Sequence, residues 1–179
     1  MKRILCLLLA LCMMLPVVAL AEGAVKVGQV QYAAHGSNAF AVMTVVLQDD
    51  VIIAAYIDEY QFTGEGEGIV TVPTGDNREN GMGAKFPEGQ VLISKRTNNA
   101  YYSGNMAERG GATQELATSY DAIQAFAVGK TVEELKAAVE GYTEETKADF
   151  VAADVVSGST LADTLNYLKG LIAAAEAAQ

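Results

Sequence analysis

The sequence predicts an α+β fold, in which the N-terminal half forms an antiparallel sheet and the C-terminal half contributes the helices. Residues 40–47 and 51–62 are rich in apolar and β-branched residues and are separated by a short polar break, a pattern typical of a hairpin. From Ala112 onward, helix-starting and helix-ending residues bound several segments, and the last of these has apolar residues at three- and four-residue spacing. Strands in one part of the chain and helices in the next are typical of an α+β domain.

The strands are expected in the following order. Residues 22–30 form a partly extended lead-in and residues 31–38 are less regular, before the two strands that the break at 48–50 joins. Residues 64–68 alternate Gly and Glu, which favours a loop, and residues 69–72 form a short strand that the following proline stops.

The middle of the chain gives fewer signals. Residues 74–89 predict a second long loop, and loops of this length are often functional or mobile. Residues 91–96 predict a strand, whereas residues 97–111 are polar and predict no element.

The helices follow. Thr113 or Thr118 could begin a helix that runs through Ala127. Residues 131–134 have the form of a capping box, which predicts a second helix that ends near Gly141. A turn is expected within 143–148, residues 150–156 lead to the last helix, and that helix is expected from Leu161 to about Ala178 because Leu161, Leu165, Leu168, Leu171 and Ile172 share one face.

Residues 1–21 have the three parts of a Sec-type signal peptide. Met1-Lys2-Arg3 is basic, residues 4–18 are nearly all apolar, and Ala19-Leu20-Ala21 matches a small-x-small cleavage site. We therefore expect residues 22–179 to form one exported domain, periplasmic or extracellular at the cell envelope, with no transmembrane segment in the mature chain.

Composition excludes several classes of function. Cys6 and Cys12 leave with the signal peptide, so the mature chain has no disulfide, thiolate metal ligand or cysteine nucleophile. A zinc site of His and Cys is also excluded, because His35 is the only histidine. Loss of Lys2 and Arg3 changes the formal net charge from −10 to −12, and such acidity argues against binding to nucleic acid or to anionic lipid.

A short polar segment precedes the last predicted helix. It reads Asp154-Val155-Val156-Ser157-Gly158-Ser159-Thr160. One interpretation is a helix cap, since its Ser and Thr residues can serve as N-cap and Thr160-x-x-Asp163 has the form of a capping box. The other is a bound phosphoryl group, because the unpaired N–H groups and the dipole of a helix N-terminus attract anions.

The pattern Asp-x-x-Ser-Gly-Ser-Thr resembles the flavinylation motif of the FMN-binding domain family, Asp-x-x-Ser/Thr-Gly-Ala-Thr. That family occurs in sodium-pumping NADH:quinone reductases and in stand-alone extracytoplasmic proteins. Its final Thr carries FMN through a phosphoester bond that a separate flavin transferase forms outside the cytoplasm. The resemblance covers seven residues, and the expected order of sheet first and motif helix last agrees with it.

The resemblance implies that Thr160 carries FMN and that Asp154, Ser157 and Gly158 are recognition and cradle residues. Ser159 replaces the usual Ala and adds one hydroxyl. A covalent bond would hold anionic FMN even on an acidic chain. The implied partners are the flavin transferase and a membrane electron-transfer complex, with this chain an electron carrier to an external acceptor rather than a complete enzyme.

Other residues are candidates for contacts with the flavin. Lys95 and Arg96 are adjacent cations in an acidic chain, and one of them could meet the phosphate or the ring edge. Alternatively, they alternate across a strand, one solvated and one paired with an acid. Tyr101 and Tyr102 could stack on the ring or pack at the rim of the sheet. His35 could bind the flavin, shuttle a proton or be only structural.

A second interpretation of the chain is a non-catalytic exported binding or interaction module with the same fold and no flavin. The motif would then be a helix cap with at most a small-anion site. A Ser-His-Asp hydrolase is not expected, because the chain has no Gly-x-Ser-x-Gly segment. Yellow colour that survives denaturation would distinguish the flavoprotein from the module.

Overall fold

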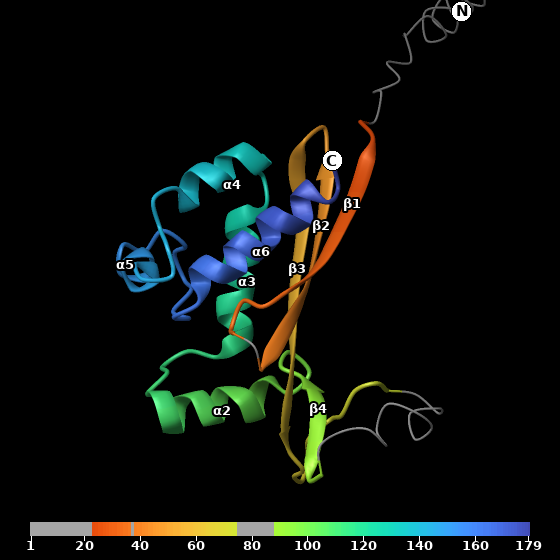
Figure 1. The fold of residues 1–179 in the computed structure, drawn as a ribbon, viewed down its shortest axis with the longest axis vertical. Coiled ribbons are helices and arrows are strands. Elements are labelled where there is room, and N and C mark those ends of the chain that lie inside the picture. Colours follow the sequence, from red (N-terminus) through yellow and green to blue (C-terminus); the bar gives the residue numbers. More distant parts are fainter. Residues whose placement is uncertain (1–22, 37, 75–87) are drawn as a thin grey trace, which may run out of the picture.

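The computed structural model describes residues 23–36, 38–74 and 88–179. Four strands form one antiparallel sheet in the order β1-β2-β3-β4, and the helices follow in the second half of the chain (Figure 1). The predicted α+β fold is therefore confirmed. The predicted signal peptide and most of the predicted 74–89 loop lie outside the described residues.

The sheet is built on a long hairpin. Its strands are β1 (Val25–Tyr32), β2 (Ala39–Gln48), β3 (Val51–Gly64) and β4 (Gln90–Ser94). Asp49 and Asp50 form the turn between β2 and β3 with φ angles of 49° and 65°, which suit the twist of a tight two-residue connection. The first strand runs past the end of the predicted lead-in, to Tyr32, and the predicted strand at 69–72 is only an isolated bridge from Thr71 to Ile93.

The helices are α2 (Asn99–Gly110), α3 (Leu116–Ala127), α4 (Val132–Val139), α5 (Lys147–Ala152) and α6 (Thr164–Glu176). The predicted capping box of α4 is confirmed: the Thr131 hydroxyl accepts from the Glu134 N–H at 3.3 Å, and the Glu134 carboxylate accepts from the Thr131 N–H at 2.8 Å. Helix α2 forms where no element was predicted, and α5 forms where only a turn and a lead to the last helix were predicted.

The core lies between the sheet and α6. Residues of β2 alternate, so that Met43, Val45 and Leu47 are buried against the helices. Helix α6 crosses β1 and β2 at very short range, because a Cβ at Gly28 would overlap the carbonyl oxygen of Ala174 and a Cβ at Gly170 would overlap the Met43 sulfur. Small residues therefore set the depth at which α6 lies on the sheet.

The helices lie on one side of the long strands, and α2 lies on that side near the end of the sheet that carries β4 (Figure 1). This arrangement leaves a space bounded by β3, β4, α2 and the segment before α6, and the candidate site lies there. Among the described residues, no helix combines the length and apolar character that a membrane crossing requires.

Candidate functional site

A cavity of about 970 Å³ lies where the sheet, α2 and the segment before α6 meet. Its sheet side carries Gln61, Thr63 and Lys95, the last directly after β4. Its other walls carry Tyr101, Tyr102 and Arg109 from α2, residues 160–163 and Tyr167 from the α6 side, and His35 from the β1–β2 connection. Cavities of this size hold cofactors and other organic ligands, and aromatic walls with a few polar groups are typical of them.

Thr160, the predicted attachment residue, lines this cavity and is exposed. Its backbone N–H approaches the Ser119 hydroxyl at 3.4 Å, and no described residue forms a hydrogen bond with its own hydroxyl. Thr160 is therefore reached both from the cavity and from solvent.

The rest of the motif lies outside the cavity. Ser159 is buried, and its hydroxyl is 2.8 Å from the hydroxyl of Thr164, so the hydroxyl that replaces the usual Ala methyl has an internal partner. Gly158 adopts φ of 87°, and its carbonyl oxygen accepts a hydrogen bond from the Gln114 amide at 2.7 Å. Asp154 and Ser157 are exposed.

The helix behind the motif begins later than predicted. Helix α6 starts at Thr164 instead of Leu161 and ends at Glu176 instead of Ala178. The capping box of Thr160 and Asp163, which was one of the two interpretations of this segment, is absent, because Asp163 is itself the N-cap and forms no side-chain cap bond. Thr160 therefore precedes the first turn of α6, and the helix N-terminus supports phosphate binding at this residue less directly than expected.

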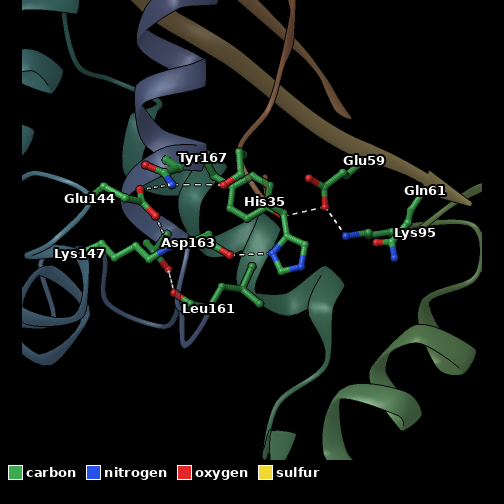
Figure 2. Close-up of polar contacts among 12 residues, drawn as sticks. His35, Glu59, Gln61, Lys95, Glu144, Lys147, Leu161, Asp163 and Tyr167 are labelled. Carbon is green, nitrogen blue, oxygen red and sulfur yellow. Dashed lines mark hydrogen bonds and ion pairs between the residues drawn. The ribbon is translucent and has the colours of Figure 1, made fainter. Parts of the chain in front are cut away.

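The Asp163 carboxylate contacts His35 and Lys147 instead. Its Oδ2 is 2.6 Å from His35 Nδ1, and its Oδ1 accepts from Lys147 Nζ at 2.7 Å (Figure 2). The hydrogen bond from His35, and then that from Lys147, hold the pKa of Asp163 below its ordinary value although partial burial opposes them. The carboxylate thus fixes the orientation of His35 at the cavity edge.

Lys95 belongs to a buried polar cluster in the cavity wall. Its side chain is 1% exposed and is paired with Oε2 of Glu59, which is fully buried. The same oxygen accepts from the hydroxyls of Tyr167 at 2.8 Å and Tyr120 at 3.3 Å. Burial raises the pKa of both tyrosines well above the ordinary value, so both phenols remain neutral hydrogen-bond donors.

Arg96 lies outside the cavity. Its guanidinium donates to the carbonyl oxygen of Ile57 at 2.6 Å and to the Gln124 side chain at 2.7 Å, and it lies 2.9 Å from the Asp121 carboxylate. Of the two adjacent cations that the sequence singled out, only Lys95 lines the cavity. Each is paired with an acid, so the predicted solvated member of the pair is not found.

The two tyrosines on α2 both line the cavity. The Tyr101 hydroxyl is 3.0 Å from the Thr63 hydroxyl, and the Tyr102 hydroxyl donates to the Gln61 side chain at 3.2 Å. Their hydrogen bonds tie α2 to β3 across the end of the sheet.

Sequence reasoning missed Glu59 and Tyr167 as members of the site. A signal for Glu59 existed, because alternation along β3 places it on the same inward face as Ile57, where an ionised side chain needs a partner. Asp58 and Glu59 are adjacent on β3 and lie on opposite faces: Asp58 accepts from the Ser94 hydroxyl at 2.7 Å, whereas Glu59 faces the cluster.

Comparisons with protein-family models, with curated proteins and with solved structures found no match for this chain. The function proposed below is therefore based on the motif and on the geometry of the cavity. Among the described residues, no group of three or more His, Cys, Asp or Glu side chains could hold a metal ion.

Proposed function

We propose that this chain is an exported flavoprotein that carries FMN through a phosphoester bond to Thr160 and transfers electrons between a membrane redox partner and an external acceptor. One observation carries the proposal. Thr160, Lys95, Tyr101 and Tyr102, which the sequence singled out in three separate segments, line the same cavity. A helix cap alone would not require such convergence.

The residues of the cavity fit the group. Thr160 is at the exposed edge, where a phosphoester can form, and Tyr101, Tyr102 and Met106 provide aromatic and apolar surface for a flat ring. Bound FMN would supply a ring that accepts and returns electrons, while the protein supplies binding, orientation and electrostatics. Lys95 is the buried cation available for that electrostatic role.

The motif is accessible to a separate enzyme. Asp154, Ser157, Gly158 and Thr160 are exposed, so a flavin transferase could contact them on the folded domain. The hydroxyl of Ser159 is directed inward to Thr164, which means that the departure from the family pattern does not alter this exposed surface.

The test is covalent attachment. The full chain is produced in cells that also produce a flavin transferase, and the intact mass of the purified protein is measured. We expect a gain of one FMN less one water, located on the peptide that contains Thr160, and we expect Thr160→Val to abolish it because the variant keeps the side-chain shape but has no hydroxyl. Thr113→Val is the matched control, since Thr113 also lines the cavity but lies outside the motif.

Two results would contradict the proposal. One is an unmodified wild-type mass under conditions that flavinylate a known substrate domain, which would favour the non-catalytic binding module. The other is covalent flavin retained in Thr160→Val, which would move the attachment to another residue.

A further inference from the structure

The buried pair of Lys95 and Glu59 has hydrogen-bonding capacity that the fold does not use. Oε1 of Glu59 is buried and has no hydrogen-bond partner among the described residues. An ammonium group has three N–H donors, and Lys95 forms one hydrogen bond, to Oε2 of Glu59. An ion pair that served only stability would satisfy these groups, because unpaired buried polar atoms are costly.

Lys95 is the member of this pair that lies at the cavity. It is among the lining residues, whereas Glu59 is not. Its Nζ lies 4.4 Å from the centre of the Tyr102 ring, which itself lines the cavity and fixes the ammonium from one side. Figure 2 shows Lys95 and Glu59 on one side of His35 and Tyr167, with Asp163 on the other.

The other polar and charged groups in and behind the cavity wall lie on different elements. Tyr167 and Tyr120 are neutral donors to Glu59, and Asp163 is paired with His35 and Lys147. Arg109 of α2 and Glu65 after β3 lie on exposed parts of the cavity lining, where solvent screens them. Lys95 is therefore the cation in the low-dielectric part of the described lining, where a charge acts most strongly on a ligand.

We propose that the Lys95 ammonium, held by Glu59, binds the acceptor edge of the flavin ring and stabilises the negative charge that the ring gains on reduction. The inference rests on the proposed function. When a redox protein delivers two electrons and one proton enters from solvent, the ring gains one net negative charge. Lys95 keeps its proton and compensates that charge.

The test is the midpoint potential of the loaded protein. The full chain is flavinylated in cells, loading is checked by intact mass, and the potential is measured by spectroelectrochemical titration at fixed pH. Lys95→Met is expected to weaken binding of the reduced form relative to the oxidised form at least tenfold, which lowers the potential of a two-electron couple by about 30 mV or more. Lys95→Arg keeps the positive charge, so its midpoint potential is expected to lie much closer to that of the wild type than the potential of Lys95→Met does.

Lys130→Met is the matched control. Lys130 Nζ lies 4.2 Å from the Phe126 ring centre, much as Lys95 lies over Tyr102, but it does not line the cavity. Its loss is expected to leave the potential unchanged. If Lys95→Met does not fold, the double variant Glu59→Gln/Lys95→Met removes both charges together, and a smaller fall in potential is expected because Lys95 is the nearer charge.

The outcomes separate the two proposals. Wild-type protein that takes up no FMN contradicts the proposed function and this inference with it. The other outcome is that FMN-loaded Lys95→Met, or the FMN-loaded double variant, has the same midpoint potential as the wild type. This result overturns the role of Lys95 and leaves attachment at Thr160 intact.

Discussion

Asp163 connects three parts of the chain through one carboxylate. It is the N-cap of α6, it contacts His35 in the β1–β2 connection, and it accepts from Lys147 in α5. These contacts hold the segment that contains Thr160 against the edge of the sheet. The ionisation of Asp163 is therefore expected to affect the stability of the fold.

We predict that Asp163→Asn lowers the free energy of unfolding by about 1 to 3 kcal/mol near pH 5, since charged hydrogen bonds are lost. His35 and then Lys147 lower the pKa of Asp163 from its ordinary value of 3.8. A group with a lowered folded-state pKa stabilises the fold above its unfolded pKa and loses that effect as the pH falls through the folded one. The wild type and the variant should therefore become similar in stability as the pH falls below about 3.8.

Urea unfolding at several pH values between 2.5 and 5.5 measures this difference. Asp149→Asn is the control, because Asp149 is exposed and forms no ion pair with a described residue. A difference between wild type and Asp163→Asn that stays constant across this pH range would show that the charge of Asp163 is not its source.

At the scale of single residues, the sequence identified the candidates but not their partners. Thr160 was identified through the Asp-x-x-Ser-Gly-Ser-Thr pattern. Lys95 was identified because it is one of two adjacent cations in an acidic chain. The pairing of Lys95 with Glu59, and of Arg96 with Asp121, depends on which strand and helix faces meet. No local pattern contains that information.

At the scale of elements, close packing of α6 on β1 depends on Gly28. A methyl group there would overlap the carbonyl oxygen of Ala174 and crowd the backbone nitrogen of Ala178. These are backbone atoms, so a change of side-chain rotamer cannot relieve the contact and the helix must move. Gly28→Ala is expected to reduce the free energy of unfolding by about 1 to 3 kcal/mol.

Gly104→Ala is the matched control for this prediction. Gly104 lies inside α2, and a Cβ there would meet no atom within 4 Å. Since Ala is a better helix former than Gly, this variant is expected to gain about 0.5 to 1 kcal/mol. Urea midpoints measure both variants, and a Gly28→Ala protein as stable as the wild type would contradict the close approach of α6 to β1.

The elements that the sequence predicted well have strong local signals. Alternation in β2 and the capping box of α4 are examples, since each depends on residues close in sequence. Helix α2 has no such signal, because it is polar and none of its residues is buried. It is held instead by tertiary contacts: the side chain of Asn99 accepts from the Ala117 N–H, and that of Ser103 from the Leu116 N–H.

Those contacts also explain the start of α3. The first N–H groups of a helix need acceptors, and α3 has no side-chain bond from its own N-cap residue, Glu115. Residues of α2 supply the acceptors at 2.9 and 3.0 Å. Two helices that the sequence treats separately therefore stabilise each other, and a method based on local patterns cannot find this.

At the scale of the whole molecule, the cavity is a product of topology. Thr160 and Lys95 are far apart in sequence and are brought to one cavity because α6 packs back on β1 and β2 while α2 follows β4 at one end of the sheet. The fold class followed from the order of strands and helices along the chain. The site did not, because it depends on how those elements meet.

The Glu59 cluster connects most of the fold. Its members come from β3, the end of β4, α3 and α6, through Glu59, Lys95, Tyr120 and Tyr167. We predict that Lys95→Met destabilises the flavin-free protein by about 3 to 5 kcal/mol, because Glu59 is left buried without its counter-ion. Replacing both charges is expected to cost far less, since uncharged side chains of similar size need no compensation.

Urea unfolding of the wild type, Lys95→Met, Glu59→Gln and the double variant gives the coupling energy of the pair. We expect the double variant to be more stable than Lys95→Met, because removing the second charge relieves the defect left by removing the first. Additive losses would mean that Lys95 and Glu59 do not depend on each other.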